Sequence, residues 1–292
     1  MNEAMKQSVR NALKTYVTRC GSQRKASATL KEVSAATINK ILNNTDTGSI
    51  SDEMWLSLYN QLGAATLDNE WIVCEQTDAY KRMNFVLNQC QNESLVAAVI
   101  GEAGAGKSEA NKRWAQQHKN VLLLTCGEHW NRKEFINKLL EKTGAKPNGA
   151  TLAEMVDEVV LRISRMADPI LILDEADKLS DPVFYFFITL YNQLEYKCGI
   201  VMTATAFLEK RIRRGLRLGK RGYEEIYSRL GRKFVYLNPT SDNDIHAVCL
   251  ANGIADTQTI KKIIKQSEGD LRRTRRAIWV EKQRIKSELL NH

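Results

Sequence analysis

Two kinds of hydrophobic pattern divide the chain near residue 95. Before this point, apolar residues recur every three or four positions, as they do on the buried face of an amphipathic helix. Val9 and Leu13 form one such pair, and Trp55 and Leu58 form another. After residue 95, short apolar runs alternate with longer amphipathic segments. The first part of the chain is therefore predicted to be all-helical, and the remainder to be of the α/β class.

The short apolar runs are typical of strands that are buried on both faces. They are 95–100 (LVAAVI), 121–125 (VLLLT), 170–173 (ILIL), 200–205 (IVMTAT) and 234–237 (FVYL). Five such strands separated by helical segments predict a parallel sheet with helices on both faces. From Ser241 onward the pattern is helical again, and Leu250, Ile260 and Ile278 are expected in its core.

These changes of pattern predict three domains. They are an all-α domain over 1–65, an α/β core over 66–239 and a small helical domain over 240–292. A length of 292 residues agrees with about two domains, or with a large domain and a small appendage. The apolar runs fall far short of the roughly 18 residues that a membrane span needs. The N-terminus also lacks the apolar segment of a signal peptide.

The six cysteines have no CxxC spacing, and the four histidines do not cluster with them. A zinc site or a disulfide scaffold is therefore not expected, and reduced, mostly buried thiols are. This cysteine usage predicts a cytoplasmic protein.

The segment Gly101–Ser108 (GEAGAGKS) has the pattern GxxxxGK[ST] between a predicted strand and a predicted helix. That is the context of a phosphate-binding loop. Glycines let consecutive backbone N–H groups curl around phosphate oxygens at a helix N-terminus. Lys107 supplies a charge for the β- and γ-phosphates, and Ser108 a hydroxyl for Mg²⁺. The predicted nucleotide-binding residues are Gly101, Glu102, Ala103, Gly104, Ala105, Gly106, Lys107, Ser108 and Glu109.

A second acidic motif follows the third apolar run, in ILILDEAD (170–177). Asp174 stands at the carboxyl end of this strand, where open α/β sheets bind their ligands. It is a predicted Mg²⁺ ligand, and the adjacent Glu175 is predicted to orient and polarise the attacking water. Because the chain has no guanine-reading NKxD motif, ATP is the expected nucleotide. The two motifs together predict an ATPase.

The net charge of +9 is concentrated in two blocks. Residues 207–236 hold ten Lys and Arg against three Asp and Glu, and residues 261–286 hold the same numbers. Focused charge of this kind favours a nucleic-acid partner, because phosphate binding needs cations gathered on one surface. A solvated helix face is the alternative reading of each block.

Residues 21–44 (GSQRKASATLKEVSAATINKILNN) have the pattern of a helix-turn-helix, with Ser22 and Ser34 as helix N-caps. The second helix is expected to present Thr37, Asn39 and Lys40 outward, as candidates for DNA contact. The turn has Lys31 where glycine is common, and the outward face has no arginine to read guanine. DNA binding with little sequence preference, protein binding and a plain helical bundle are therefore the three alternatives.

With these motifs in place, the region from about residue 68 to the C-terminus resembles the AAA+ ATPases, and among them the initiator-like group. The resemblance implies a sheet core with a small helical lid. It also implies that Thr205, or Thr203, is the sensor 1 residue, that Arg272 is the sensor 2 residue, and that Arg229 is an arginine finger with Arg232 as its rival. Thr77 matches the segment that packs near adenine, or else it is a plain helix N-cap.

A helix-turn-helix fused to a short core of this type resembles the phage Mu transposition protein B family. Proteins of that family bind DNA non-specifically as ATP-dependent helical oligomers, deliver target DNA to a transposase and stimulate strand transfer. The transposase in turn stimulates ATP hydrolysis. The resemblance also implies that the cytoplasm is that of a bacterium or of a phage-infected host cell. The resemblance therefore implies three kinds of partner: double-stranded DNA, a transposase, and further copies of the chain in a filament or ring.

Two further groups of basic residues are candidates for the DNA contact. Arg132, Lys133, Lys142 and Lys146 follow the second strand, where initiator-like relatives carry an extra helix toward the central channel. Lys210, Arg211, Arg213 and Arg214 belong to the first basic block. The first group is favoured, because the second precedes the proposed finger and could serve a subunit interface.

Two other functions fit the same motifs. One is a replication factor, either a helicase loader or an origin initiator, although only about twenty residues follow Arg272 and leave no room for a C-terminal winged helix. The other is a transcriptional regulator switched by nucleotide. Glu175 argues against that reading, because a pure switch does not need a carboxylate that activates water.

Overall fold

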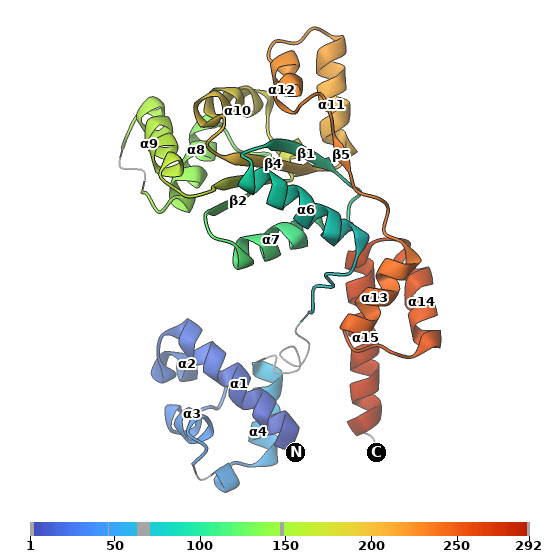
Figure 1. Ribbon diagram of the computed structural model, residues 1–292. Coiled ribbons are helices and arrows are strands. Elements are labelled where there is room, and N and C mark those ends of the chain that lie inside the picture. Colours follow the sequence, from blue (N-terminus) through green and yellow to red (C-terminus); the bar gives the residue numbers. More distant parts are fainter. Residues whose placement is uncertain (1–2, 46, 63–70, 147–148, 291–292) are drawn as a thin grey trace. The chain divides into compact units, whose positions relative to one another are not determined.

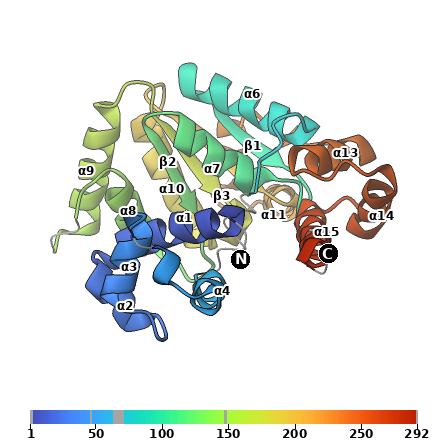
Figure 2. The ribbon, with the colours of Figure 1, turned by 90° about the horizontal axis from the view of Figure 1, so that it is seen from below.

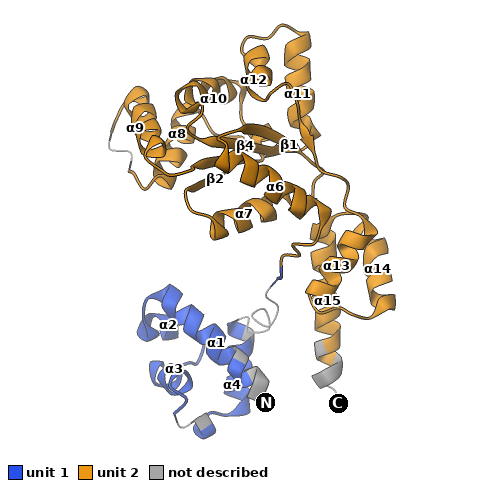
Figure 3. Ribbon diagram, in the orientation of Figure 1, with its two compact units in different colours: residues 1–72 blue, residues 73–292 orange. Residues whose placement is uncertain are grey.

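Two units make up the chain, residues 1–72 and 73–292 (Figure 3). The structure is a computed structural model and describes residues 3–45, 47–62, 71–146 and 149–290. The domain boundary expected between residues 65 and 66 lies outside the described residues.

The first unit is all-helical, as predicted. Its elements are α1 (Glu3–Cys20), α2 (Gln23–Thr29), α3 (Ala35–Leu42), the 3₁₀ turn η1 (Thr47–Ser49) and α4 (Asp52–Gln61). Both predicted N-caps are confirmed, since the Ser22 hydroxyl accepts from the Lys25 amide and the Ser34 hydroxyl from the Thr37 amide. One apolar core joins the four helices, with Val9, Leu13, Ala26, Leu30, Val33, Ile38, Ile41, Trp55 and Leu58 among its buried residues.

The turn between α2 and α3 is held from α4. Its left-handed residue is Glu32, with φ of 60°, and not Lys31. The Lys31 amide donates to Gln61 Oε1 at 2.7 Å, and Gln61 Nε2 donates back to the Lys31 carbonyl at 3.1 Å. A side chain of α4 thus fixes a turn that lacks the usual glycine.

The second unit contains a five-stranded sheet in the order β2-β3-β4-β1-β5, with every pair parallel. The strands are β1 (Val96–Ile100), β2 (Val121–Thr125), β3 (Ile170–Asp174), β4 (Gly199–Ala204) and β5 (Val235–Tyr236). Each lies within one of the predicted runs or within one residue of it. Thr125 pairs with Asp174, and Asp174 with Thr203, so the carboxyl ends of the strands form one edge.

Helices cover both faces of this sheet, as predicted (Figures 1 and 2). One face is covered by α6 (Asp78–Asn92) and α7 (Lys107–Gln117), through buried residues such as Met83 and Trp114. The other face carries α8 (Arg132–Lys142), α9 (Leu152–Ser164), α10 (Asp181–Leu194), α11 (Ala206–Arg217) and α12 (Tyr223–Arg229), and the 3₁₀ turn η2 (Ala176–Lys178) follows β3. The nucleotide motifs lie between these layers at the carboxyl edge.

The chain ends in three helices, α13 (Asp242–Ala251), α14 (Thr257–Ser267) and α15 (Leu271–Leu290). Ile260 and Ile278 are buried, as expected, but the expectation for Leu250 is wrong, because its side chain is 49% exposed. Helix α13 packs instead through Ile245 and the adjacent Val248 and Cys249, which shifts its buried face.

All six cysteines are unpaired, and five of them are buried. Burial raises the pKa of Cys198 to about 12 and that of Cys249 to about 11, so these thiols stay protonated and unreactive at neutral pH. Among the described residues, no helix is both long enough and apolar enough to cross a membrane.

Candidate nucleotide-binding site

The phosphate-binding loop joins β1 to α7 and has the backbone that its sequence requires. Gly104 and Gly106 have φ of 81° and 91°, a left-handed conformation that costs glycine little. Gly106 is the N-cap of α7 and offers no side-chain acceptor to the first amides of the helix. Those amides are therefore available to an anion, and the positive end of the helix dipole favours one.

Lys107 lies against this loop. Its Nζ donates to the carbonyl of Gly101 at 2.6 Å and to that of Glu102 at 2.8 Å. Burial lowers the pKa of the Lys107 amine, against the opposing charges of Asp174 and Asp177. Arg272 also lowers the pKa of Lys107, so all these charges lie within electrostatic reach of one another.

Asp174 ends β3 and is almost fully buried, with 2% of its surface exposed. Its Oδ1 accepts from the Thr203 hydroxyl at 2.7 Å, and Asn111 Nδ2 donates to that hydroxyl at 3.0 Å. This chain of bonds links α7, β4 and β3 behind the phosphate loop. Sequence reasoning missed Asn111, which lies one helical turn after Lys107 and is fully buried. A polar residue on the buried face of this helix could have indicated a role in the site.

Glu175 adopts a left-handed conformation, with φ of 56° and ψ of 42°. Such a conformation costs a residue with a side chain about 1 kcal/mol or more and is found most often at functional sites. Glu175 Oε2 pairs with Lys178 Nζ at 2.6 Å, and the hydrogen bond and charge of that carboxylate raise the pKa of Lys178. The proposed water-activating group is thus held by a lysine that sequence reasoning did not single out.

The two candidate sensor 1 threonines have different surroundings. Thr203 is fully buried and bonded to Asp174, as described above. Thr205 is the N-cap of α11, is partly exposed, and donates to Asp177 Oδ2 at 2.7 Å. Thr203 therefore holds the acid in place from inside the sheet, whereas Thr205 stands at the surface of the carboxyl edge.

The small helical domain contacts the phosphate loop at the start of α15. The Leu271 amide donates to the Gly104 carbonyl at 3.1 Å. A Cβ on Gly104 would lie 2.1 Å from Asp270 Oδ1, so any other residue there would displace the Asp270 side chain. Arg272 is exposed in the first turn of α15 and is thereby placed near the loop.

The remaining predicted nucleotide-site residues belong to the start of α6, the end of α12 and the turn after α12. Thr77 is the buried N-cap of α6, and its hydroxyl accepts from the Tyr80 amide. Arg229 ends α12 and donates to Asn192 Oδ1 at 3.1 Å, with its guanidinium over the Tyr191 ring. Arg232 is exposed in the following turn, with φ of 56°.

The two groups of basic residues differ in their partners. The side chains of Arg132, Lys133, Lys142 and Lys146 are all exposed, at the two ends of α8 and just beyond it. No hydrogen bond or ion pair holds any of them within the described part of the chain. In the other group, Lys210 and Arg214 are exposed, whereas Arg213 pairs with Glu209 at 2.6 Å.

Arg211, a predicted DNA contact, is bonded within its own chain. Its guanidinium donates to Tyr223, Asp181 and the Leu179 carbonyl. Each of its three guanidinium nitrogens thus has a partner within the chain, and its role in DNA binding stays a prediction.

On α3, the second helix of the predicted helix-turn-helix, Asn39 is exposed and Thr37 and Lys40 are half-buried. Lys40 Nζ donates to the Ser49 hydroxyl at 3.3 Å, and Asn39 accepts from Asn43 at 2.8 Å. Lys40 is the one basic side chain on α3 (Ala35–Leu42), and the role of these three residues as DNA contacts stays a prediction.

The chemistry of the donors fits ATP with Mg²⁺. Asp174 and Ser108 offer hard oxygen ligands, which this ion prefers. The described residues contain no cluster of three or more His, Cys, Asp and Glu side chains that would hold a metal alone.

Comparison with known proteins gives a family model, a curated relative and a solved structure that are similar to this chain. Residues 91–212 match the family model described as AAA domain. The Mu-like prophage FluMu DNA transposition protein B of Haemophilus influenzae is 24% identical over 251 residues, which are 82% of this chain and 84% of that protein. A chain in a structure of Drosophila ORC bound to DNA has a TM-score of 0.48 at 16% identity; the match covers 75% of this chain and only 60% of that one.

Proposed function

We propose that this chain, which carries an AAA domain and resembles transposition protein B of a Mu-like prophage, is an ATPase that binds target DNA for a transposase. The observation that carries the proposal is the joining of a complete phosphate loop to Asp174 and Glu175 at one edge of the sheet. The similarity to a transposition protein over most of both chains gives the biological setting.

In the proposed reaction, Lys107 leaves its two loop carbonyls and neutralises the β- and γ-phosphates of ATP. Asp174 and Ser108 would hold Mg²⁺, which would supply positive charge at the phosphates. Glu175 accepts hydrogen bonds from the attacking water and orients it in line with the bond that breaks. Lys178 bonds to Oε2 of this carboxylate, so Oε1 can accept from the water while the pair persists.

Two further arginines would complete the site. Arg272, at the start of α15, moves with the small helical domain and so can report the nucleotide to that domain. Arg229 is proposed to reach the γ-phosphate of a neighbouring copy, where it meets charge that develops only in the transition state. Hydrolysis would then depend on assembly into a filament or ring.

The DNA contact is proposed to be mainly to phosphate. The exposed cations of the α8 group, Arg132, Lys133, Lys142 and Lys146, have no partners in the described structure and suit this role. The helix-turn-helix is a second DNA surface, with Lys40 as its cation and few groups that could read bases. Contacts of this kind predict affinity that falls steeply with salt and varies little with sequence.

The function is tested by measuring DNA binding and hydrolysis together. Full-length protein with a non-hydrolysable ATP analogue is expected to assemble on DNA of arbitrary sequence, and with ADP to release it. Added DNA is expected to raise the rate of ATP hydrolysis. Equal DNA affinity in both nucleotide states, with no change in hydrolysis, would contradict the proposal.

The helix-turn-helix keeps one second candidate open, a nucleotide-switched transcriptional regulator. The favouring observation is the outward face of α3, with Asn39 and Lys40. That function predicts tight binding to one DNA sequence over its competitors. Binding curves for unrelated duplexes of equal length therefore separate the two functions.

A further inference from the structure

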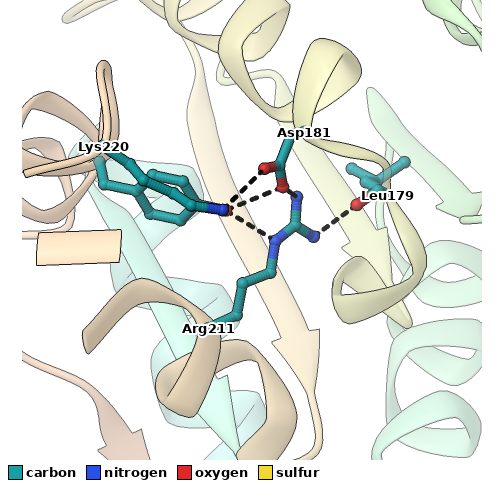
Figure 4. A network of polar contacts seen from close by, with 5 residues as sticks. Leu179, Asp181, Arg211 and Lys220 are labelled. Carbon is teal, nitrogen blue, oxygen red and sulfur yellow. Dashed lines mark hydrogen bonds and ion pairs between the residues drawn. The ribbon is translucent and has the colours of Figure 1, made fainter. Parts of the chain in front are cut away.

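A polar network centred on Arg211 joins three helices on the α8–α12 side of the sheet (Figure 4). Arg211 belongs to α11. Its Nε donates to the Tyr223 hydroxyl at 3.0 Å and one terminal nitrogen donates to Asp181 Oδ1 at 2.6 Å, while the other donates to the Leu179 carbonyl. The guanidinium carbon also lies 4.7 Å from the centre of the Phe184 ring. We call these residues the Arg211 network.

The network connects the two segments that carry the proposed hydrolytic groups. Asp181 is the first residue of α10 and follows Glu175 by only six positions. Tyr223 is the first residue of α12, whose last residue is Arg229. The Tyr223 hydroxyl donates to Asp181 Oδ1 at 2.9 Å, so the starts of the two helices are bonded directly.

The other end of α12 is also bonded to α10. Arg229 donates to Asn192 Oδ1 at 3.1 Å, and its guanidinium lies 5.2 Å from the centre of the Tyr191 ring. The Arg229 guanidinium must leave these two partners to reach a neighbouring subunit, so Tyr223 at the start of α12 is the contact that holds the helix to α10 while Arg229 acts. Helix α10 begins six residues after Glu175. The helix that positions the proposed finger, Arg229, is therefore also connected directly to the hydrolytic residues of its own subunit.

The packing around Tyr223 leaves little freedom. A Cβ on Gly215 would lie 2.3 Å from the Tyr223 ring, so this ring packs directly on the backbone of α11. Although burial alone raises the pKa of Asp181, hydrogen bonds from Tyr223 and Arg211 hold the pKa of that carboxyl below its usual value. Asp181 is thus ionised at neutral pH, and its bonds in the network are charge-assisted.

We infer that Arg211, Asp181 and Tyr223 are positioning residues, which hold α12 so that Arg229 reaches the nucleotide of the neighbouring subunit. The inference rests on the proposed role of Arg229 in trans. Its physical basis is that a finger stabilises the transition state only at a fixed geometry, and a misplacement of about 1 Å can cost ~10²-fold in rate.

The first test uses Arg211→Ala. This variant is expected to bind ATP with unchanged affinity and to assemble, because the phosphate loop is untouched, but to hydrolyse ATP about 10²-fold more slowly. A second variant, Tyr223→Phe, keeps every cation and the buried ring and removes one hydroxyl. Its expected loss is about 3- to 10-fold, the effect of one or two hydrogen bonds. Tyr185→Phe is the matched control, because the Tyr185 hydroxyl has no bond in the described structure.

Mixed assemblies show which site the network serves. In a mixture of Arg211→Ala and Lys107→Ala subunits, the only intact nucleotide site belongs to the Arg211 variant and receives an intact finger from its neighbour, so activity is expected to recover. In a mixture of Arg211→Ala and Arg229→Ala subunits, the only finger present is the displaced one, so no recovery is expected.

Any other pattern overturns the inference. Recovery only with Arg229→Ala would mean that the network serves the site of its own subunit. Recovery in both mixtures, or in neither, would mean that the damage is not confined to the finger. If Arg211→Ala fails to fold, the same two mixtures made with Tyr223→Phe decide the matter. The mixture of Arg229→Ala with Lys107→Ala tests separately whether Arg229 acts in trans. If this mixture shows no recovery, the proposed role of Arg229 is wrong, and not only the proposed role of the Arg211 network.

Discussion

The nucleotide site and the basic surfaces differ in how the chain holds their functional groups. Asp174, Thr203 and Asn111 are buried and bonded to one another. Arg132 and Lys133, by contrast, are exposed and have no partner in the described structure. A site that must place charge within a fraction of an ångström is built into the core, whereas a surface that binds a repeating polyanion needs only available cations.

The same difference separates cations within the basic block. Arg211 and Arg213 pair with acidic groups of their own chain, whereas Lys210 and Arg214 are exposed. A count of charges along the sequence treats all four as alike. If this block binds DNA, we expect Lys210 and Arg214, which have no ion pair in the described structure, to contribute more than the paired Arg211 and Arg213.

The largest effect is expected from Arg229→Ala. An arginine finger contributes about 10³- to 10⁵-fold in related phosphoryl transfer, so hydrolysis should fall by that order while ATP binding persists. Rates of phosphate release in mixtures with Lys107→Ala should show partial recovery, because mixed interfaces can contain one intact site. No recovery in any mixture, with both variants assembled, would show that Arg229 does not act in trans, and Arg232→Ala would then be the next variant to examine.

Glu175→Gln and Lys107→Ala should fail in different ways. The glutamine cannot activate water, so hydrolysis should fall by about 10²- to 10⁴-fold, while ATP and Mg²⁺ remain bound. The alanine removes phosphate neutralisation, so nucleotide affinity itself should weaken. Equilibrium binding of ATP and single-turnover hydrolysis separate the two outcomes. A Glu175→Gln protein with the wild-type rate would exclude Glu175 as the water-activating group.

Much of this site could be predicted from the sequence because its chemistry restricts residue types over short spacings. The phosphate loop and the Asp174–Glu175 pair are each contained in eight consecutive residues. The five strands were equally visible, since a strand buried on both faces is a continuous apolar run. Asn111 was missed because its partner, Thr203, comes from another element of the folded chain. Lys178 was missed because its pairing with Glu175 belongs to no fixed motif.

Where the prediction was wrong, tertiary packing decided the outcome. Leu250 continues the helical spacing of the C-terminal segment, but α13 turns Ile245 and Val248 toward the core and leaves Leu250 exposed. The spacing of apolar residues predicts how often a buried position recurs along a helix, whereas packing against neighbouring helices decides which residues occupy those positions. The partners of Arg211 likewise lie 12 to 32 positions away in sequence, beyond any local pattern.

Thr203→Val and Thr205→Val sharpen the contrast between buried and surface positions inside the site. The first removes a bond to Asp174 and leaves Asn111 without its acceptor, so it should lower the free energy of unfolding by about 1–3 kcal/mol. The second affects a partly exposed cap and should lower the hydrolysis rate more than stability. Thermal unfolding and turnover measured on both proteins check this. Equal losses of stability would remove the distinction that we draw between the two threonines.

The smallest effect concerns the DNA surface. Removing one cation that binds a phosphate should reduce the slope of log affinity against log salt by about one unit. Removing both charges in Arg132→Ala/Lys133→Ala should therefore lower the slope by about two units, with little change between DNA sequences. The matched double variant Lys210→Ala/Arg214→Ala should lower it less, because α11 leads toward the proposed finger helix. Both are measured with a non-hydrolysable ATP analogue, so that assembly is held constant. Unchanged slopes in both, with assembly intact, would assign the main DNA contact to the helix-turn-helix, where Lys40→Ala would then have the larger effect.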